Sequence, residues 1–462
     1  MALSPKKPGL PAKKKTLSVK KSLAQAEPLT VTRRHEARQD TRKRVNYFFI
    51  IDKIPTGVWA LFALAFGIAL RLAFPSGLAY WDDIDYSMIA KTIEEDRYLI
   101  HHYSNWFGHR IPVIFPVAFF MKMFGYHEWV LMLWPFTAAV LNMILIYFTA
   151  RLLFNKTAAF YSLLLLAIHP LDVKYSTLLL PASVYTLLLL AGLFFFLWGE
   201  KIRPKNVHLV FRLGLPQLRT KVMARYSRLQ SRYTWLRYTL WMFFWLTGCA
   251  FFVGTFYVRA YGLIVLGVPA VYMLVRYRLR WEYIFIPLFA GLVFISVEYY
   301  LKTVTGEWFF IYKFLKSRVG PDLYPIDNVT KHLDYYRDMM FDNRTYSAFT
   351  YPLLIFLPVY LANFKKMSSR TRASLAVPLS FLVIFFGYME FGVTSIEHVT
   401  FLHKLERYIG LITPGICLII GRVIAVRTPA RAIPLVVLFL VAVTIYWLQT
   451  AGLPPWIQKG GL

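Results

Sequence analysis

Three carboxylates stand within four positions near residue 80, at Asp82, Asp83 and Asp85. The stretch that contains them, WDDIDYSMIAKTI, has helical spacing, which puts Asp82 and Asp85 on one face and Asp83 on a neighbouring face. One interpretation is the solvated acidic start of an ordinary helix, with Asp82 as its N-cap. The other is a reactive site, because a cluster of charges beside a membrane is costly unless it is used.

Histidines and an arginine follow in the same segment, at His101, His102, His109 and Arg110. The spacing of the histidines matches no familiar metal motif, so the sequence predicts no metal site there. Arg110 precedes the apolar run 111–125, which is too short to cross a membrane and is expected to lie at the interface. A guanidinium at that level suits a phosphate, although an arginine that only reaches toward the head groups would look the same.

The composition places these residues in a membrane protein. The chain has 462 residues, of which 57% are hydrophobic and 18% aromatic, and its mean hydropathy is +0.48. The net charge of +29 lies in short runs between apolar segments, a pattern that orients a protein in a bilayer rather than one that binds nucleic acid. The two cysteines, Cys249 and Cys417, lie inside apolar runs and cannot form a disulfide framework.

Apolar runs predict an all-α polytopic membrane protein of about eleven transmembrane helices. The predicted spans are 54–74, 128–153, 158–169, 176–198, 239–254, 257–275, 283–301, 346–361, 374–389, 408–424 and 433–448. Basic residues gather in alternate loops, which predicts a cytoplasmic N-terminus and two long outer loops, 75–127 and 302–345. The first outer loop is expected to hold amphipathic juxtamembrane helices.

Three regions follow from this map. Residues 1–48 are predicted to be a disordered, basic cytoplasmic tail that rests against anionic lipids. Residues 49–425 are expected to form one transmembrane module with both outer loops, and residues 426–462 to add the last transmembrane helix and a short outer C-terminus. The expected location is the inner membrane of a cell or its equivalent, with the reactive site on the outer face.

Several motifs resemble those of the GT-C class of integral-membrane glycosyltransferases, nearest to the protein O-mannosyltransferase and aminoarabinose-transferase-like branch. The first is the acidic stretch from Asp82 to Tyr86, and the second runs from Arg110 to a Phe-Gly pair at 124–125. The others are Ala-Arg at 150–151, GTFYVR at 254–259 and Glu-Arg-Tyr at 406–408. Two departures are Asp83, where the family usually has glutamate, and the missing second acid, for which Asp172 is a substitute candidate.

The resemblance implies a GT-C-like bundle that moves a sugar from a polyprenyl-phosphate donor to an acceptor hydroxyl on the non-cytoplasmic face, with inversion. Asp82 would be the catalytic base and Asp83 its orienting partner. The resemblance also implies a set of substrate-binding residues, comprising Asp85, Tyr86, His109, Arg110, Arg259, Lys404 and Arg407. Of these, Arg110, Arg259, Lys404 and Arg407 would hold the phosphate. No cofactor is required, although paired acids can also hold a divalent cation.

Two other functions fit parts of the same pattern. A transporter or flippase of lipid-linked sugars would keep the basic residues near the outer face without needing the pair Asp82 and Asp83. A catalytically silent scaffold would keep the fold alone, and the presence of both acids argues against it. The expected partners are the lipid-linked sugar, a hydroxyl acceptor of unknown kind and membrane lipids, with no nucleic acid.

Overall fold

The computed structural model describes residues 55–78, 81–95, 110–203, 228–277, 284–306, 364–391, 393–395, 400–401 and 410–427, and a few isolated positions. The chain divides into two units, Met1–Lys53 and Ile54–Leu462. All described residues belong to the second unit. The predicted tail 1–48 lies outside them, as do the predicted spans 346–361 and 433–448 apart from isolated residues.

The described part of the chain is helical, as predicted. Its longer helices are α2 (Thr56–Ala73), α3 (Trp81–Glu94), α5 (Ile111–Phe124), α6 (Glu128–Leu153), α7 (Lys156–Ile168), α9 (Pro181–Ile202), α12 (Arg228–Val258), α13 (Gly267–Tyr277), α14 (Phe285–Thr305), α18 (Ser369–Phe391) and α19 (Thr413–Arg427). Shorter elements are α8 (Pro170–Tyr175), η2 (Ala260–Leu266) and η6 (Phe364–Lys366). A small antiparallel ladder joins β1 (Val393–Ser395) to β2 (Thr400–Phe401).

Six of these helices are long and apolar enough to cross a membrane. They are α2, α6, α9, α14, the Trp235–Val258 part of α12 and the Ser369–Met389 part of α18. The predicted spans 158–169, 257–275 and 408–424 correspond to shorter apolar helices, so the predicted total of eleven remains a prediction. The segment 257–275 is not one continuous α-helix, because the 3₁₀ helix η2 precedes α13.

The start of α9 differs from the expected position. The sequence predicts a span from residue 176, but the helix begins at Pro181 after an extended residue, Leu180 (φ −117°, ψ 154°). Proline fits the first turn of a helix because its missing N–H would have no partner there. The residues before it belong to the turn that follows α8, which bears on the candidate site.

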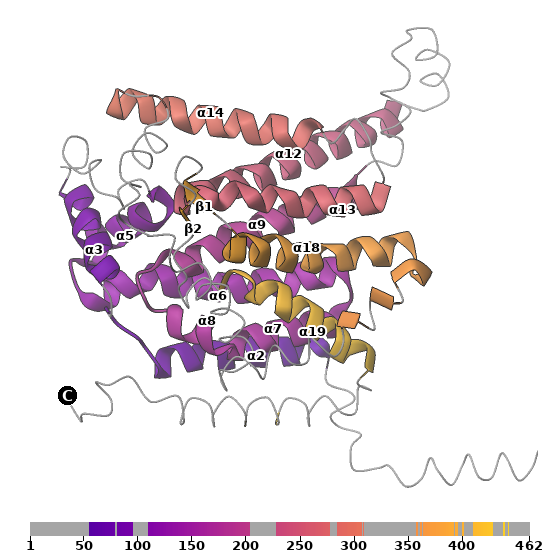
Figure 1. Ribbon diagram of the computed structural model, residues 1–462, viewed down its shortest axis with the longest axis horizontal. Coiled ribbons are helices and arrows are strands. Elements are labelled where there is room, and N and C mark those ends of the chain that lie inside the picture. Colours follow the sequence, from indigo (N-terminus) through magenta and orange to yellow (C-terminus); the bar gives the residue numbers. More distant parts are fainter. Residues whose placement is uncertain are drawn as a thin grey trace, which may run out of the picture. The chain divides into compact units, whose positions relative to one another are not determined.

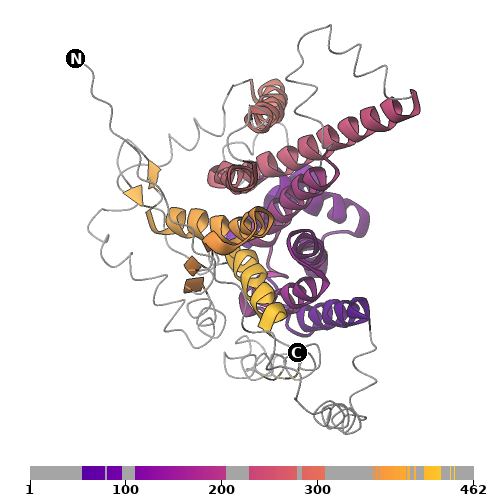
Figure 2. The same ribbon diagram turned by 90° about the vertical axis from the view of Figure 1, so that its right-hand side faces the viewer.

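Close helix packing at the centre depends on glycine. Helix α9 lies between α6 and α12 (Figure 1) and contacts both. At the α9–α12 crossing, a Cβ on Gly192 would lie 2.6 Å from the ring of Phe252 and 3.1 Å from the carbonyl oxygen of Gly248. Small residues at such crossings let helix backbones approach in a membrane. In Figure 2 the orange α18 and the yellow α19 lie side by side, in contact with each other.

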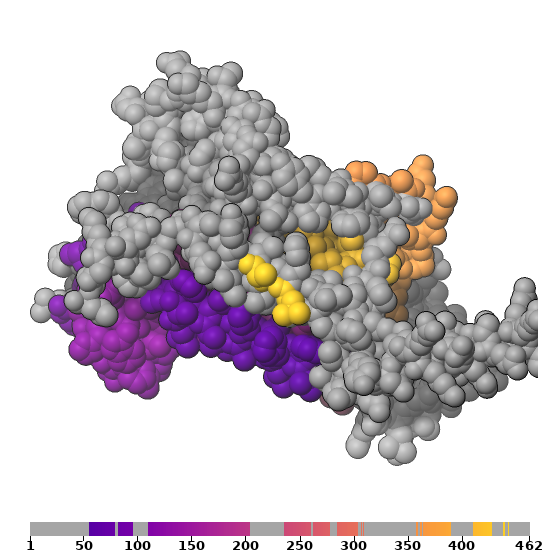
Figure 3. Space-filling model, turned by 90° about the horizontal axis from the view of Figure 1, so that it is seen from below, coloured from indigo at the N-terminus to yellow at the C-terminus, as the bar shows by residue number. Residues whose placement is uncertain are grey.

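Helix α2 has an exposed apolar side. Figure 3 shows a broad indigo surface, and indigo is the colour of the segment near residue 60 that contains α2. Leu61, Phe62 and Leu72 on α2 are each more than half exposed. An apolar helix face of this kind is expected to meet lipid rather than water.

One end of the bundle, the basic end, carries most of the arginines and lysines near helix termini. Its members are Arg151, Lys156, Lys201, Arg203, Arg276, Lys365, Lys366, Arg370, Arg372 and Arg422. The Arg203 guanidinium lies 5.4 Å from the centroid of the Trp241 ring and 4.9 Å from that of Tyr277, which joins the ends of α9, α12 and α13. Helices α3 and α5 lie at the opposite end, where α2 ends and α6 begins.

Candidate active site

Helix α3 carries the predicted catalytic pair in its first turn. The partial positive charge of a helix N-terminus stabilises carboxylates there. The two aspartates have different surroundings: Asp83 is 0% exposed, while Asp82 and Asp85 are half-buried. Asp82 therefore presents part of its surface for contact with a substrate, whereas Asp83 is buried.

Arg110 lies against α3, as the predicted site requires. Its guanidinium carbon is 5.4 Å from the centroid of the Tyr86 ring, and this ring is buried. A cation on an aromatic face is stabilised by about 2 kcal/mol when the pair is shielded from water. Arg110 is also the N-cap of α5. The start of α5 is attached to α6 by a hydrogen bond, in which the Trp134 indole N–H donates to the Pro112 carbonyl at 3.0 Å. The carboxylates and this cation thus share one location.

Arg259 follows α12 directly and is 5% exposed. It begins a tight turn in which the Gly262 N–H donates to the Arg259 carbonyl at 2.7 Å and the Thr255 hydroxyl donates to the Gly262 carbonyl at 2.9 Å. A Cβ at Gly262 would lie 2.2 Å from the Thr255 carbonyl carbon, so the turn requires glycine. The glycine that shapes the turn beside Arg259 is therefore Gly262, whereas Gly254 of the motif GTFYVR lies inside α12.

The end of α12 adjoins the start of α5. Ile111, the residue after Arg110, packs against a small apolar cluster that includes Tyr257, two residues before Arg259. Both predicted phosphate-binding arginines that the structure describes therefore belong to neighbouring segments at the α3 end of the bundle.

An acid that the sequence analysis did not single out lies in the same neighbourhood. Glu298 on α14 is 1% exposed and accepts a hydrogen bond from the Tyr257 hydroxyl at 3.2 Å. The signal for it was available, since an ionisable residue inside an apolar span is unusual and has a specific partner as a rule.

A second buried group of charges joins α2 to α7 and α8. Arg71 is 0% exposed, forms an ion pair with Asp172, and donates to the carbonyl oxygens of Ala167 at 3.0 Å and Leu166 at 3.3 Å. His169, at the junction of α7 and α8, is buried beside this pair. Burial raises the pKa of Asp172, and Arg71 opposes that change.

This contact bears on the candidate second acid. The sequence analysis considered Asp172 as a substitute for the second acid of the family, and the structure pairs its carboxylate with Arg71. Asp172 therefore has a partner inside the bundle.

Other predicted site residues lie outside the described residues. They are His109, Lys404 and Arg407, together with His101 and His102. The second outer loop, 302–345, is described only at its start. Within the described residues, no three His, Cys, Asp or Glu side chains gather closely enough to hold a metal ion. The divalent cation therefore remains a prediction.

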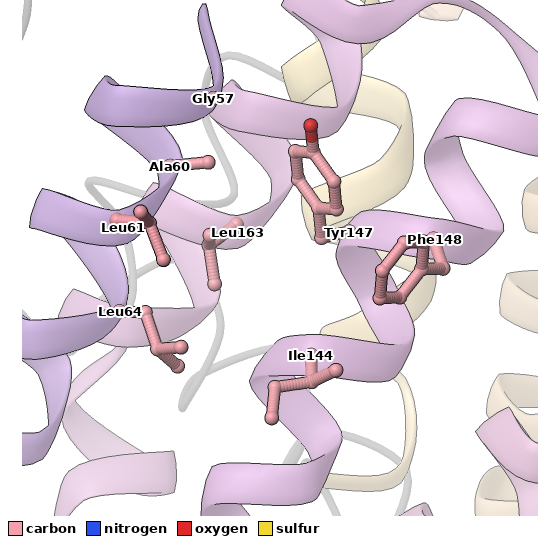
Figure 4. Close-up of a pocket in the computed structure, with 8 residues that line it drawn as sticks. All are labelled: Gly57, Ala60, Leu61, Leu64, Ile144, Tyr147, Phe148 and Leu163. Atoms are coloured by element: carbon pink, nitrogen blue, oxygen red, sulfur yellow. The ribbon is translucent and has the colours of Figure 1, made fainter.

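A pocket of about 160 Å³ lies elsewhere in the bundle, between α2, α6 and α7 (Figure 4). Its lining is apolar apart from the Tyr147 hydroxyl and consists of Gly57, Ala60, Leu61, Leu64, Ile144, Tyr147, Phe148 and Leu163. It lies toward the start of α2 and the end of α6, away from the carboxylates of α3. It has no group that could carry out acid–base chemistry at neutral pH, so it is not the candidate site.

Comparison with known proteins supports the resemblance seen in the sequence. Residues 111–213 match the family described as dolichyl-phosphate-mannose-protein mannosyltransferase. The match covers α5 to α9 and begins one residue after Arg110, so the carboxylates of α3 lie outside it. A comparison with curated proteins finds no match.

Among solved structures, the crystal structure of the Archaeoglobus fulgidus oligosaccharyltransferase complex with Zn and sulfate matches with 15% identity and a TM-score of 0.42. The match covers 84% of this chain and 52% of that one, so this chain spans about half of that protein's length. A likeness at this level carries no argument about the site.

The family match and the span-length apolar helices together define the class. The family match supports the resemblance to GT-C-type glycosyltransferases, and the six span-length helices are those of a polytopic helical membrane protein. The donor, the acceptor and the face of the membrane on which the site lies are matters of proposal.

Proposed function

We propose that this protein transfers a single sugar from a polyprenyl-phosphate donor to an acceptor hydroxyl of a lipid, glycan or protein, on the non-cytoplasmic face of the membrane. Residues 49–425 would be the catalytic module, and the basic tail 1–48 would rest on the cytoplasmic leaflet. The observation that carries the proposal is the location of Arg110 beside α3, where Asp82 is accessible and Asp83 is buried.

The chemistry needs few groups. Asp82 takes the proton of the acceptor hydroxyl as its oxygen bonds to the anomeric carbon. The bond from that carbon to the phosphate oxygen breaks, its electron pair leaves with the phosphate, and the product is the free polyprenyl phosphate. Because one displacement occurs at the anomeric carbon, the configuration inverts. A phosphate is a good leaving group, so no strong general acid is required.

Cations would stabilise the charge that develops on the departing phosphate. Arg110 and Arg259 supply guanidinium groups at the α3 end of the bundle, and Lys404 and Arg407 are further candidates. A guanidinium can hold two phosphate oxygens at once, which favours arginine at such sites. Asp83, being buried, would orient Asp82 or the sugar. Asp85 and His109 would complete the substrate contacts, and Tyr86, whose ring is buried, would hold Arg110 in place.

The test is sugar transfer by the purified protein with a panel of polyprenyl-phosphate sugars and hydroxyl acceptors, wild type beside Asp82→Asn. We expect Asp82→Asn to lose turnover by at least about 100-fold while its donor affinity stays within about twofold, because the amide cannot accept the proton. Glu95→Gln, which changes an exposed acid just after α3, is the matched control and should keep full activity.

Two outcomes would contradict the proposal. Asp82→Asn with wild-type turnover would remove the assigned base. The protein would be a transporter if wild type and Asp82→Asn both bind the donor and move it across a bilayer, and neither cleaves it. A parallel series with a chelator tests the divalent cation: lost turnover restored by a divalent metal would reassign the acids from base to metal ligand.

A further inference from the structure

The linker between α2 and α3 is held by polar contacts to distant parts of the chain. The Ser76 N–H donates to Thr177 Oγ1 at 2.7 Å, and the Ser76 hydroxyl donates to the Lys174 carbonyl at 2.8 Å. The Leu78 N–H donates to Glu128 Oε1 at 3.3 Å. These contacts attach the residues six and four positions before Asp82 to α8, to the turn that follows it and to the start of α6.

The linker conformation also depends on Gly77. Its φ of +62° lies in the left-handed region, which glycine adopts without strain. A Cβ there would lie 2.8 Å from Glu128 Oε1, so any larger residue would disturb the same carboxylate that holds Leu78. The backbone conformation of the linker beside the start of α6 therefore depends on glycine at position 77.

The ion pair between Arg71 and Asp172 anchors the linker at its α2 end. Arg71 is in the last turn of α2 and Asp172 in the first turn of α8. The pair therefore fixes the end of α2 against α8, which supplies Lys174 and leads directly into the turn that supplies Thr177. Burying a guanidinium is costly, and the carbonyl oxygens of Leu166 and Ala167 together with the carboxylate offset that cost.

Helix α3 depends on this linker for its position. Among the described elements α3 packs mainly against α5, and Ile84 and Met88 on its outward side are exposed. A single contact surface allows a helix to slide or rotate, and the linker removes that freedom at the end that carries Asp82. Placement matters because a shift of 1 Å in a reacting group can cost about 100-fold in rate.

We propose that Thr177, Ser76 and Glu128, anchored by the Arg71–Asp172 pair, are positioning residues that fix the start of α3 and so the catalytic carboxylates. The inference rests on the proposed function for its catalytic consequence. It gives Asp172 a role in positioning rather than in substrate contact. It assigns a function to a contact network that joins residues about 100 positions apart.

The first test is Thr177→Val, which keeps the shape of the side chain and removes the acceptor of the Ser76 N–H. We expect kcat to fall about tenfold, with the KM for donor within about twofold, because a displaced base slows the reaction without weakening donor binding. Thr177→Ser restores the hydroxyl and should recover kcat to within about twofold.

The control is Thr149→Val, near the end of α6 and far along that helix from Glu128. Thr149 is equally buried, and its hydroxyl has no hydrogen-bond partner in the part of the chain that the structure describes. This variant should have wild-type kcat and KM. Glu128→Gln, which removes the charge from the acceptor of the Leu78 N–H, should lower kcat in the same direction as Thr177→Val.

A second measurement does not depend on the function. Hydrogen exchange of the protein in lipid nanodiscs should show faster exchange in peptides covering residues 74–85 of Thr177→Val, since the Ser76 N–H loses its partner, while Thr177→Ser and Thr149→Val match wild type. Unchanged exchange in Thr177→Val would overturn the inference, whatever the protein's activity.

The two hypotheses fail differently. If Asp82→Asn is inactive and Thr177→Val has wild-type kcat, the positioning role is wrong and the proposed function stands. If Asp82→Asn is fully active while residues 74–85 are loosened in Thr177→Val, the proposed function is wrong. A fall in kcat that accompanies a lower melting temperature and is not rescued by Thr177→Ser would show general damage to the fold and overturn the positioning role.

Discussion

At the scale of residues, the candidate site depends on differences in burial between side chains that look alike in the sequence. Asp82 and Asp83 are adjacent, yet only Asp82 can meet a substrate in this conformation. Arg110 lies on the buried ring of Tyr86, which limits where its guanidinium can point.

The Arg110–Tyr86 contact gives a prediction about donor affinity. Tyr86→Leu should weaken donor binding about 5- to 30-fold, since a shielded cation–π contact contributes roughly 1–2 kcal/mol to holding Arg110 in place. Tyr86→Phe keeps the aromatic face and should bind donor within about twofold of wild type. The measurement is equilibrium binding of a polyprenyl-phosphate sugar in nanodiscs.

A matched control is Trp198→Leu, because the Lys201 ammonium lies 5.0 Å from the centroid of the Trp198 ring at the basic end of the bundle. Donor affinity should not change in this variant. Equal binding by Tyr86→Leu and wild type would mean that Arg110 does not depend on Tyr86 or does not bind donor.

At the scale of elements, the bundle is held by helices that approach closely where glycines face one another. Helix α9 contacts both α6 and α12, and it leads into the basic end through Arg203. The crossing of α9 and α12 at Gly192 and Gly248 brings the two backbones together. Because α12 ends at the turn that carries Arg259, this crossing helps to set where that arginine lies.

The crossing predicts a difference between glycines. Gly192→Ala should lower the free energy of unfolding by about 1–3 kcal/mol, because the new methyl group would overlap the buried Phe252 ring. Gly291→Ala on α14 has nothing within 4 Å of the new Cβ and should be neutral or stabilising by up to about 1 kcal/mol. Unfolding in mixed micelles measures both, and equal stabilities would contradict the observed packing.

At the scale of the whole molecule, charge is divided between the ends of the helices. The basic end holds the arginines and lysines of four or more helix termini, and the other end holds the acidic start of α3. The positive-inside rule then predicts that the basic end faces the cytoplasm. The same orientation would put the candidate site on the non-cytoplasmic face.

This orientation predicts the accessibility of introduced cysteines. The native Cys249 and Cys417 are buried and should not react with a membrane-impermeant maleimide, so they can remain in place. In sealed right-side-out vesicles we expect Glu95→Cys to be labelled and Lys201→Cys to be labelled only after permeabilisation, since both positions are exposed at opposite ends. The reverse pattern would place the carboxylates of α3 in the cytoplasm.

The sequence by itself determined the class of protein. Hydropathy and the alternation of basic loops are local properties, so they predicted the apolar helices and a membrane protein directly. Short motifs around Asp82, Arg110 and Arg259 carried the GT-C resemblance, and the family match over residues 111–213 supports it. Each motif is a contiguous stretch of sequence, so it can be recognised without knowing how the helices pack.

Only the tertiary structure decided how those residues are used. It showed that Asp83 is buried, that Arg110 meets Tyr86, and that Arg71 pairs with Asp172 across 101 positions. Burial and pairing depend on how each helix is rotated and which neighbour it meets. Those choices come from the sum of many weak contacts between distant segments, and no short stretch of sequence contains them.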